Sequence, residues 1–179
     1  MDPKSIHEVY FRLLASAQNA NMKAGVIGGS IGGIENLGKV LFDFDPGKVL
    51  DEFGGDTVKL LDHIKVVLNP KGKIRIEAKS LWPKYCITVL SAATFLRQFK
   101  DGKDFYRWAN HFYGDDRSML ALPWRLSQEI YGLGYPLAWD FMKDMGFVKY
   151  GKPDVHVRRI FLGFGLIEKP ASDYQVQRM

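Results

Sequence analysis

Residues 127–166 read SQEIYGLGYPLAWDFMKDMGFVKYGKPDVHVRRIFLGFGL and hold the pattern that decides the fold. A helical run ends at Ile130, a tight turn follows, and apolar residues then recur at helical spacing from about Pro136. Proline suits the first turn of a helix because its missing N–H would have no partner there. Gly146 is placed to end the second helix. The stretch therefore predicts two helices joined by a tight hairpin.

The turn itself is Gly132-Leu133-Gly134. Two glycines around one apolar residue let the chain reverse sharply and bring backbone N–H groups to the surface beside a helix N-terminus. Such a place attracts a phosphate, because the N–H groups and the helix dipole both favour negative charge. We therefore expect Gly132, Leu133 and Gly134 to form a phosphate site.

The element KPDVHVRR at residues 152–159 follows the hairpin, with Asp154 twenty residues beyond Gly134 and at the start of an expected helix. This arrangement resembles the DNA glycosylase superfamily named for its helix-hairpin-helix, Gly/Pro-rich loop and essential aspartate. Endonuclease III and the 3-methyladenine and 8-oxoguanine DNA glycosylases belong to it. Residues 13–19, LLASAQN, resemble the early L-L-x-S-A-Q helix terminus of the same family. The two pieces span residues 13–166, and the residues between them match only as a helical pattern.

The resemblance makes Asp154 the catalytic residue. When the bond between base and deoxyribose breaks, the sugar gains positive oxocarbenium character, which a carboxylate near C1′ stabilises while it orients or deprotonates a water. The alternative for Asp154 is a plain helix N-cap, a position that aspartate favours. The two roles are compatible, because in this family the aspartate lies at a helix start.

The resemblance also implies roles in base flipping and DNA binding. Gln18 would contact or replace the extruded base, or else simply end a helix. One of Trp139, Phe161 and Phe164 would stack on the flipped base, or these rings belong to the core. The hairpin would hold a DNA phosphate through its backbone without reading sequence, with room for a monovalent cation on its carbonyls. We expect no other metal and no cofactor.

The helical pattern extends along the whole chain and predicts an all-α, two-lobed fold of the helix-hairpin-helix glycosylase type. Residues 71–80 stay open between a strand and a helix start. We expect one domain over residues 1–179, with one lobe at 24–135, a second at 1–23 plus 136–179, and the active site in the cleft between them. Expected helix caps are Asp45, Asp56, Asp104 and Ser118.

Composition and charge set limits on function. The single cysteine, Cys86, excludes an internal disulfide and the four-cysteine iron–sulfur cluster that some family members carry. Net charge is +5, and residues 59–107 carry eleven Lys or Arg against four Asp or Glu, which indicates a basic face or a solvated helical surface. Residues 25–38 hold six glycines but no P-loop frame, which favours a loop or a loosely packed helix.

The sequence thus predicts a monomeric base-excision repair glycosylase that acts on a damaged or mismatched base in double-stranded DNA. The N-terminus resembles neither a secretory signal nor a membrane span, so we expect the cytoplasm or nucleoid of a prokaryote, or a eukaryotic nucleus. The alternative is a non-catalytic protein that recognises damaged or distorted DNA.

The hairpin also predicts a monofunctional enzyme. Family members that nick the strand carry a lysine two residues after the second glycine, where this chain has Pro136. Lyase chemistry would need Lys143, Lys149 or Lys152 instead, because the attacking group must be an amine.

Overall fold

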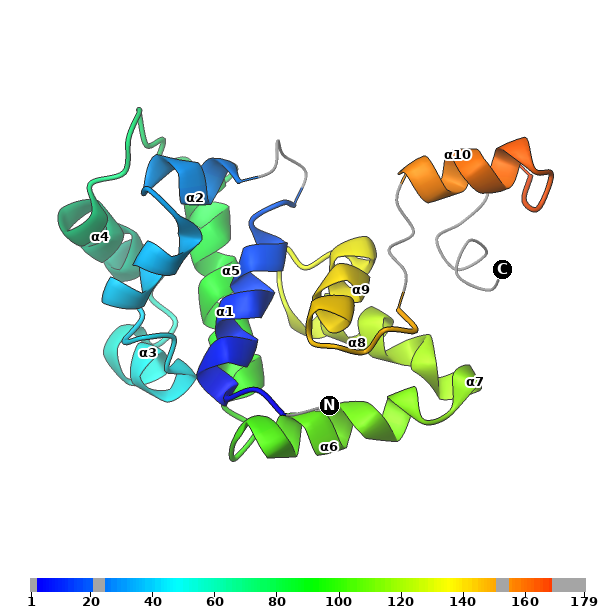
Figure 1. Cartoon of the computed structure of the whole chain (residues 1–179). Coiled ribbons are helices and arrows are strands. Elements are labelled where there is room, and N and C mark those ends of the chain that lie inside the picture. Colours follow the sequence, from blue (N-terminus) through cyan, green and yellow to red (C-terminus); the bar gives the residue numbers. More distant parts are fainter. Residues whose placement is uncertain (1–2, 21–24, 151–154, 169–179) are drawn as a thin grey trace.

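A computed structural model describes residues 3–20, 25–150 and 155–168 as a set of helices joined by short connections (Figure 1). No strand occurs within these ranges, so the all-α class is confirmed. The elements are α1 (Ile6–Ala17), α2 (Val26–Ser30), the 3₁₀ helix η1 (Ile34–Lys39), α3 (Pro46–Phe53), α4 (Thr57–Leu68), α5 (Leu81–Leu96), α6 (Gly102–Tyr113), α7 (Asp116–Met119), α8 (Ala121–Glu129), α9 (Tyr135–Asp144) and α10 (Val155–Gly163).

Aspartate side chains cap the starts of α3, α4, α6 and α7, and the first two caps are those that the sequence predicts. Asp45 accepts from the Gly47 and Lys48 N–H groups to open α3, and Asp56 does the same for α4. Two expected caps are wrong by three residues. Asp101, rather than Asp104, caps α6, and Asp115, rather than Ser118, caps α7. In both cases the expected residue supplies the N–H that the true cap accepts, because a cap bonds to the third residue of its helix.

Helix α5 is the centre of the fold, and α1 packs along it. Two buried tyrosines join them: Tyr10 donates to the Val89 carbonyl at 2.8 Å, and Tyr85 donates to the Leu14 carbonyl at 2.9 Å. Each bond satisfies a hydroxyl that would otherwise be buried unpaired, at a cost of about 1 to 3 kcal/mol. The pair therefore fixes how α1 sits on α5.

The other helices form two groups on either side of α1 (Figure 1). Helices α3 and α4 pack against α5, while α6, α8 and α9 form the second group, with α1 against both α6 and α9. The lobe boundary expected at residues 135/136 falls in the first turn of α9, and α9 packs extensively against α8. The described helices instead group as residues 25–96 and 102–150, with α1 shared.

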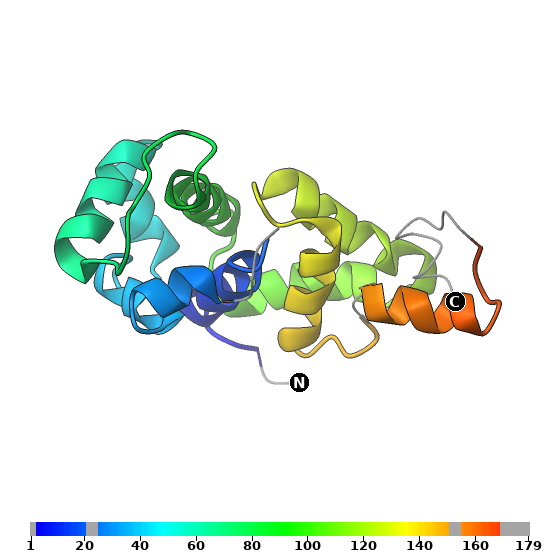
Figure 2. The ribbon, with the colours of Figure 1, turned by 90° about the horizontal axis from the view of Figure 1, so that it is seen from above.

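Helix α10 lies at the edge of the molecule and makes no extensive contact with another described helix (Figures 1 and 2). The side chains of Ile160 in this helix and of Phe164, directly after its end, are exposed. Residues 69–80, which we name the basic loop, join α4 to α5 as irregular chain, so neither the strand nor the helix start considered for residues 71–80 is present. Within the described ranges, every helix is too short or too polar to cross a bilayer.

Candidate nucleic-acid interface

The hairpin between α8 and α9 has the backbone that its glycines predict. Helix α8 ends at Glu129, Gly132 adopts φ +79°, and Gly134 is the N-cap of α9. The Leu133 N–H donates to the Ile130 carbonyl at 3.2 Å and closes the turn. Pro136 lies in the first turn of α9, as expected.

The end of α9 also follows the sequence prediction. Gly146 has φ +96°, and the Phe147 N–H donates back to the Met142 carbonyl at 3.1 Å. This is the glycine-terminated helix end that the position of Gly146 predicts.

Gly132 and Gly134 are glycines for different reasons. A Cβ atom placed on Gly132 would lie 2.6 Å from Thr88 Oγ1, in addition to the strain of its positive φ. A Cβ on Gly134 would meet nothing closer than Pro136 Cδ at 3.9 Å, and the φ of Gly134 is an ordinary −61°. The fold therefore requires glycine at position 132, whereas at position 134 glycine leaves open surface.

The hairpin presents unpaired backbone donors at the N-terminus of α9. The N–H groups of Gly132 and Gly134 have no acceptor in the described part of the chain. The partial positive charge of the ten-residue helix α9 adds to them. A phosphate oxygen is the kind of acceptor that such donors bind, since it carries charge and needs no side-chain partner.

The hairpin is held firmly on α5. The Tyr131 N–H donates to Ser91 Oγ at 3.1 Å, Gly132 lies over Thr88, and the Leu133 side chain is 1% exposed. Figure 2 shows the hairpin beside α5 when the molecule is viewed from above. Because backbone and side chain are both anchored, the two free N–H groups keep a fixed position.

A cavity of about 430 Å³ opens next to the hairpin. Gly132 and Tyr131 form one side, Ala17 at the end of α1 forms another, and Lys79 and Lys84 bring positive charge. The lining contains no carboxylate among the residues that the structure describes. This part of the site is suited to bind an anion, and a catalytic acid or base must come from elsewhere.

Gln18 lies at the C-terminus of α1, and its side chain holds the glycine-rich segment in place. Its Oε1 accepts from the Gly28 N–H at 3.1 Å, and only 9% of the residue is exposed. A Cβ on Gly28 would lie 3.0 Å from this oxygen and 3.1 Å from the Ile34 N. Gly28 therefore needs to be glycine to pack against Gln18, a role that the sequence did not indicate. Contact with a flipped base would require Gln18 to release Gly28.

The three aromatic candidates differ in exposure. Trp139 is 1% exposed, and its ring packs against Tyr150 at 4.8 Å and Tyr135 at 5.9 Å between centroids. We assign Trp139 to the core in this conformation, because protein covers its faces. Phe164 is 78% exposed at the end of α10, and Phe161 is partly buried on the same helix. The two phenylalanines thus remain the accessible candidates.

Asp154, the expected catalytic residue, lies outside the described residues, as does Lys152. The other two lysines considered for lyase chemistry have carboxylate partners. Lys149 bonds to Asp116 at 3.0 Å, and Lys143 lies 3.9 Å from Asp140. The hydrogen bond that Lys149 donates to Asp116 raises the pKa of Lys149, which opposes the neutral amine that a Schiff base needs.

Two buried groups on α5 near the hairpin cavity are also protonated at neutral pH. Burial raises the pKa of the Cys86 thiol to about 12 and that of the Tyr85 phenol well above its ordinary value. Cys86 is therefore a core residue rather than a nucleophile.

The described residues include no group of three His, Cys, Asp or Glu placed to hold a metal ion. A monovalent cation on the hairpin carbonyls, which the resemblance implies, stays a prediction. Oxygen ligands of this kind suit hard cations.

In comparisons with known proteins, no family model, no curated protein and no solved structure matches this chain. Its function is therefore argued from its own residues and geometry.

Proposed function

We propose that this protein is a monofunctional DNA glycosylase that binds duplex DNA through its hairpin and removes a damaged or mismatched base. The observation that carries the proposal is the pair of free N–H groups at Gly132 and Gly134, fixed on α5 at the start of α9. Lys79 and Lys84 in the adjoining cavity add charge of the sign that DNA requires. The resemblance of the hairpin and the Asp154 element supplies the reaction class.

The proposed residues divide the work between binding and chemistry. The hairpin holds one backbone phosphate and so sets the position of the duplex without reading its sequence. Base flipping then costs a few kcal/mol in lost stacking and pairing, which is least for a damaged or mismatched base. Asp154 supplies the carboxylate that the described cavity lacks, where it stabilises the sugar cation and directs water to C1′.

We expect no lyase step, because neither Pro136 nor Lys149 offers the neutral amine that would attack C1′. Pro136 has no amine to attack C1′, and the Lys149 ammonium is held charged by Asp116. The product would therefore be an intact abasic site. Borohydride reduction during turnover should trap no covalent protein–DNA adduct. An adduct that disappears on replacing Lys152 would overturn this part of the proposal.

The decisive experiment compares Asp154→Asn with Asp144→Asn on duplexes carrying a panel of lesions, including 8-oxoguanine, 3-methyladenine and uracil. Asp144 is an exposed carboxylate at the end of α9, so its variant makes the same chemical change away from the proposed site. We expect Asp154→Asn to lower base release by about 10² to 10⁴ while duplex affinity stays the same. Equal excision by both variants would disprove the catalytic assignment.

The second candidate is a DNA-binding protein without catalysis. The lack of a carboxylate in the described lining of the hairpin cavity favours it. Tight, lesion-dependent binding with no base released from any duplex in the panel would establish this alternative.

A further inference from the structure

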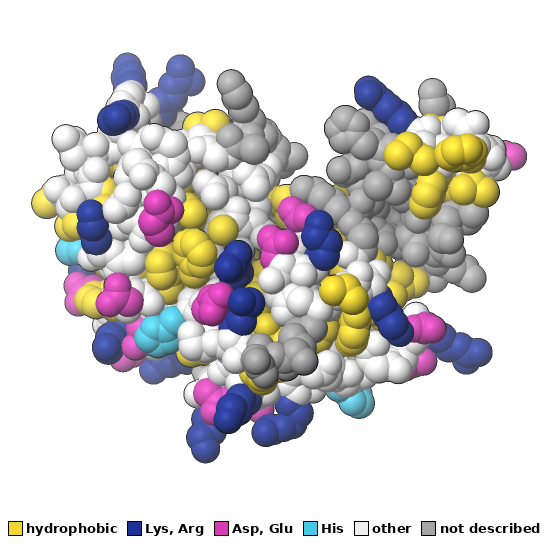
Figure 3. Space-filling view, in the orientation of Figure 1, with side chains coloured by type: hydrophobic (Ala, Val, Ile, Leu, Met, Phe, Trp, Pro, Cys, Tyr) yellow, Lys and Arg dark blue, Asp and Glu magenta, His cyan; other side chains and the backbone are white. Residues whose placement is uncertain are grey.

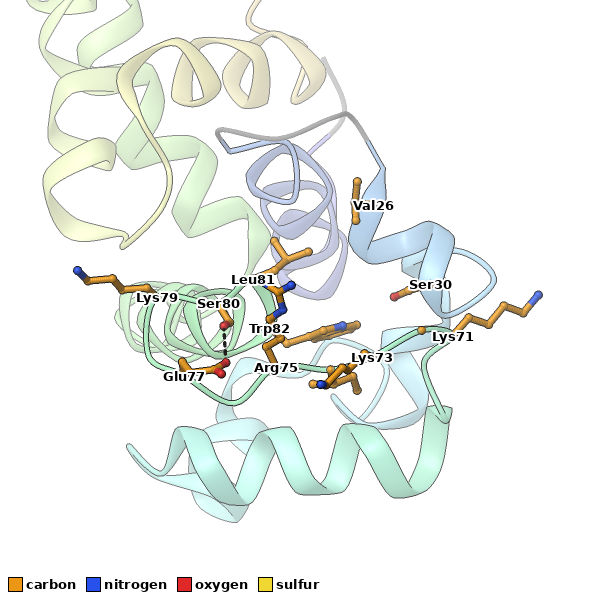
Figure 4. A pocket seen from close by; sticks show the side chains of 12 residues that line it. Val26, Ser30, Lys71, Lys73, Arg75, Glu77, Lys79, Ser80, Leu81 and Trp82 are labelled. Atoms are coloured by element: carbon orange, nitrogen blue, oxygen red, sulfur yellow. Dashed lines mark hydrogen bonds between the residues drawn. The ribbon is translucent and has the colours of Figure 1, made fainter.

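A second pocket, of about 620 Å³, opens between the basic loop and helix α2 (Figure 4). Lys71, Lys73, Arg75 and Lys79 line it, with Glu77 as the single carboxylate. Glu77 accepts from Ser80 Oγ at 3.0 Å and so faces its own loop. The loop is fixed to α2 by the Lys71 N–H, which donates to the Ser30 carbonyl at 2.7 Å. The pocket is thus strongly positive, and the basic loop that forms one side of it is hydrogen-bonded to α2.

The cations of this pocket differ from most others on the surface. Lys48, Lys59, Lys65, Arg97, Arg107, Arg125 and Lys149 each lie within 4.0 Å of a carboxylate. By contrast, Lys71, Lys73, Arg75, Lys79 and the nearby Lys84 have no such partner among the residues described. Exposed cations at the top of the molecule in Figure 3 mark this surface. Unpaired charges that gather around one hollow attract an anionic partner.

The pocket also contains unused hydrogen-bond donors. Ser80 is the N-cap of the sixteen-residue helix α5, but its side chain makes no cap bond, so the helix start stays open. Only 5% of Trp82 is exposed, yet its indole N–H donates to no acceptor within the described ranges. Figure 4 shows the indole ring lying across the pocket, between Ser30 and Lys73. These donors match the acceptor oxygens of a phosphate.

The two pockets are neighbours, because Lys79 and Leu81 line both. Helix α5 runs between them: Leu81 borders the basic pocket, and Thr88 lies under the hairpin at Gly132. Seven residues of helix separate Leu81 from Thr88, which is about 10 Å at 1.5 Å per residue. Phosphates follow one another closely along one strand of duplex DNA, so a span of this length can be bridged by neighbouring phosphates of the same strand.

We propose that the basic loop and the N-terminus of α5 form a second phosphodiester-binding site, which engages the same nucleic acid strand close to the hairpin contact. The inference rests on the proposed function, since it takes the hairpin ligand to be DNA. It goes beyond that function by adding a second contact on the backbone, made by side-chain charge instead of hairpin amides.

The test compares Lys71→Gln/Lys73→Gln/Arg75→Gln, three residues that line the second pocket and not the hairpin cavity, with a control of equal charge change, Lys100→Gln/Lys103→Gln/Arg117→Gln. All six side chains are exposed and lack a carboxylate partner in the described ranges. The control residues lie at or near α6 and α7, at the opposite end of the molecule (Figure 1). Affinity for an undamaged fluorescent duplex is measured by anisotropy over a salt series, after thermal melting shows that both variants fold like the wild type.

We expect the loop variant to bind about tenfold or more weakly at low salt. Its slope of log affinity against log salt should be shallower by about 2.7, at about 0.9 per lost phosphate contact. The control should match the wild type. Equal slopes for both triple variants would overturn the inference, as would equal competition by a polyglutamate chain, which would make an acidic polypeptide the partner of this surface.

The outcomes separate the inference from the proposed function. If the wild type binds duplex and the loop variant keeps its slope, only the second contact is disproved. If the loop variant loses slope but Asp154→Asn still releases base normally, the second contact stands and the catalytic proposal fails. A wild type that binds no duplex at any salt concentration disproves both.

Discussion

The hairpin at residues 130–134 and the basic loop at residues 69–80 both border α5, but they are built by different means. The hairpin offers neutral backbone N–H groups, and its position is fixed by the buried Leu133 side chain and the bond from Tyr131 to Ser91. The basic loop offers charged side chains on exposed, irregular chain. Packing of the hairpin on α5 thus fixes the position of its donors, whereas the unpaired charges of the basic loop attract an anion from a distance.

Gly132 and Gly72 show the same difference in packing between the hairpin and the basic loop. Gly132 in the hairpin and Gly72 in the basic loop both have positive φ, at +79° and +90°. A Cβ on Gly132 would overlap Thr88 Oγ1, whereas a Cβ on Gly72 would meet no atom within 4 Å. The two positions therefore share backbone strain and differ in packing.

The largest expected effect comes from Gly132→Ala. The substitution adds the strain of positive φ, about 1 to 2 kcal/mol, to an overlap at 2.6 Å that must displace Thr88 or the turn, about 1 to 3 kcal/mol. We expect the free energy of unfolding to fall by about 3 kcal/mol in urea denaturation. A loss below about 1 kcal/mol would show that the hairpin is not packed tightly on α5.

Gly134→Ala should have the opposite profile. Its Cβ fits the protein, so stability should change by no more than about 1 kcal/mol, the cost of alanine at an N-cap. On the outer surface, however, the added methyl group blocks close approach of a phosphate to the free N–H groups. We expect duplex affinity to fall about tenfold for every sequence alike. Unchanged affinity would exclude the hairpin as the phosphate contact.

Gly72→Ala measures the cost of positive φ in the basic loop without a contribution from packing. With open space around the new Cβ, only the positive φ opposes the change. We expect a loss of about 1 kcal/mol in unfolding free energy, roughly a third of the loss from Gly132→Ala. Equal losses at the two glycines would contradict the difference in packing between the two regions.

The smallest expected effect concerns the buried thiol of α5, the helix that both regions share. Because burial raises the pKa of Cys86 from 9.0 to about 12, the thiol ionises in the unfolded chain before it does so in the folded one. Stability from this group is thus complete below pH 9 and is lost as pH rises toward 12.

Between pH 8 and pH 9.5 the wild type should lose about 0.8 kcal/mol more unfolding free energy than Cys86→Ala, in which no thiol titrates. Chemical denaturation at the two pH values measures the difference. The titrating tyrosines are common to both proteins and cancel. Parallel pH profiles would show that the thiol reaches solvent in the folded state.

Local signals in the sequence determined the helical class, the hairpin and several of the helix boundaries. Asp45 and Asp56 cap helices, Pro136 lies in a first turn and Gly146 ends α9, as predicted. Such signals succeed because a cap or turn is decided by bonds between residues only a few positions apart. The same signals misplaced two caps by three residues, since neighbouring polar side chains compete for one helix start.

Tertiary structure alone decided which candidates are accessible and which charges are free. Trp139 proved to be core through its contact with Tyr150, and Gln18 is held by Gly28, ten residues away. The lysines of the basic loop look like any others in the sequence, yet within the described structure they lack the carboxylate partners that cations such as Lys59 and Lys149 have. Burial and ion pairing depend on which distant segments meet, and the spacing of residues along the chain does not contain that information.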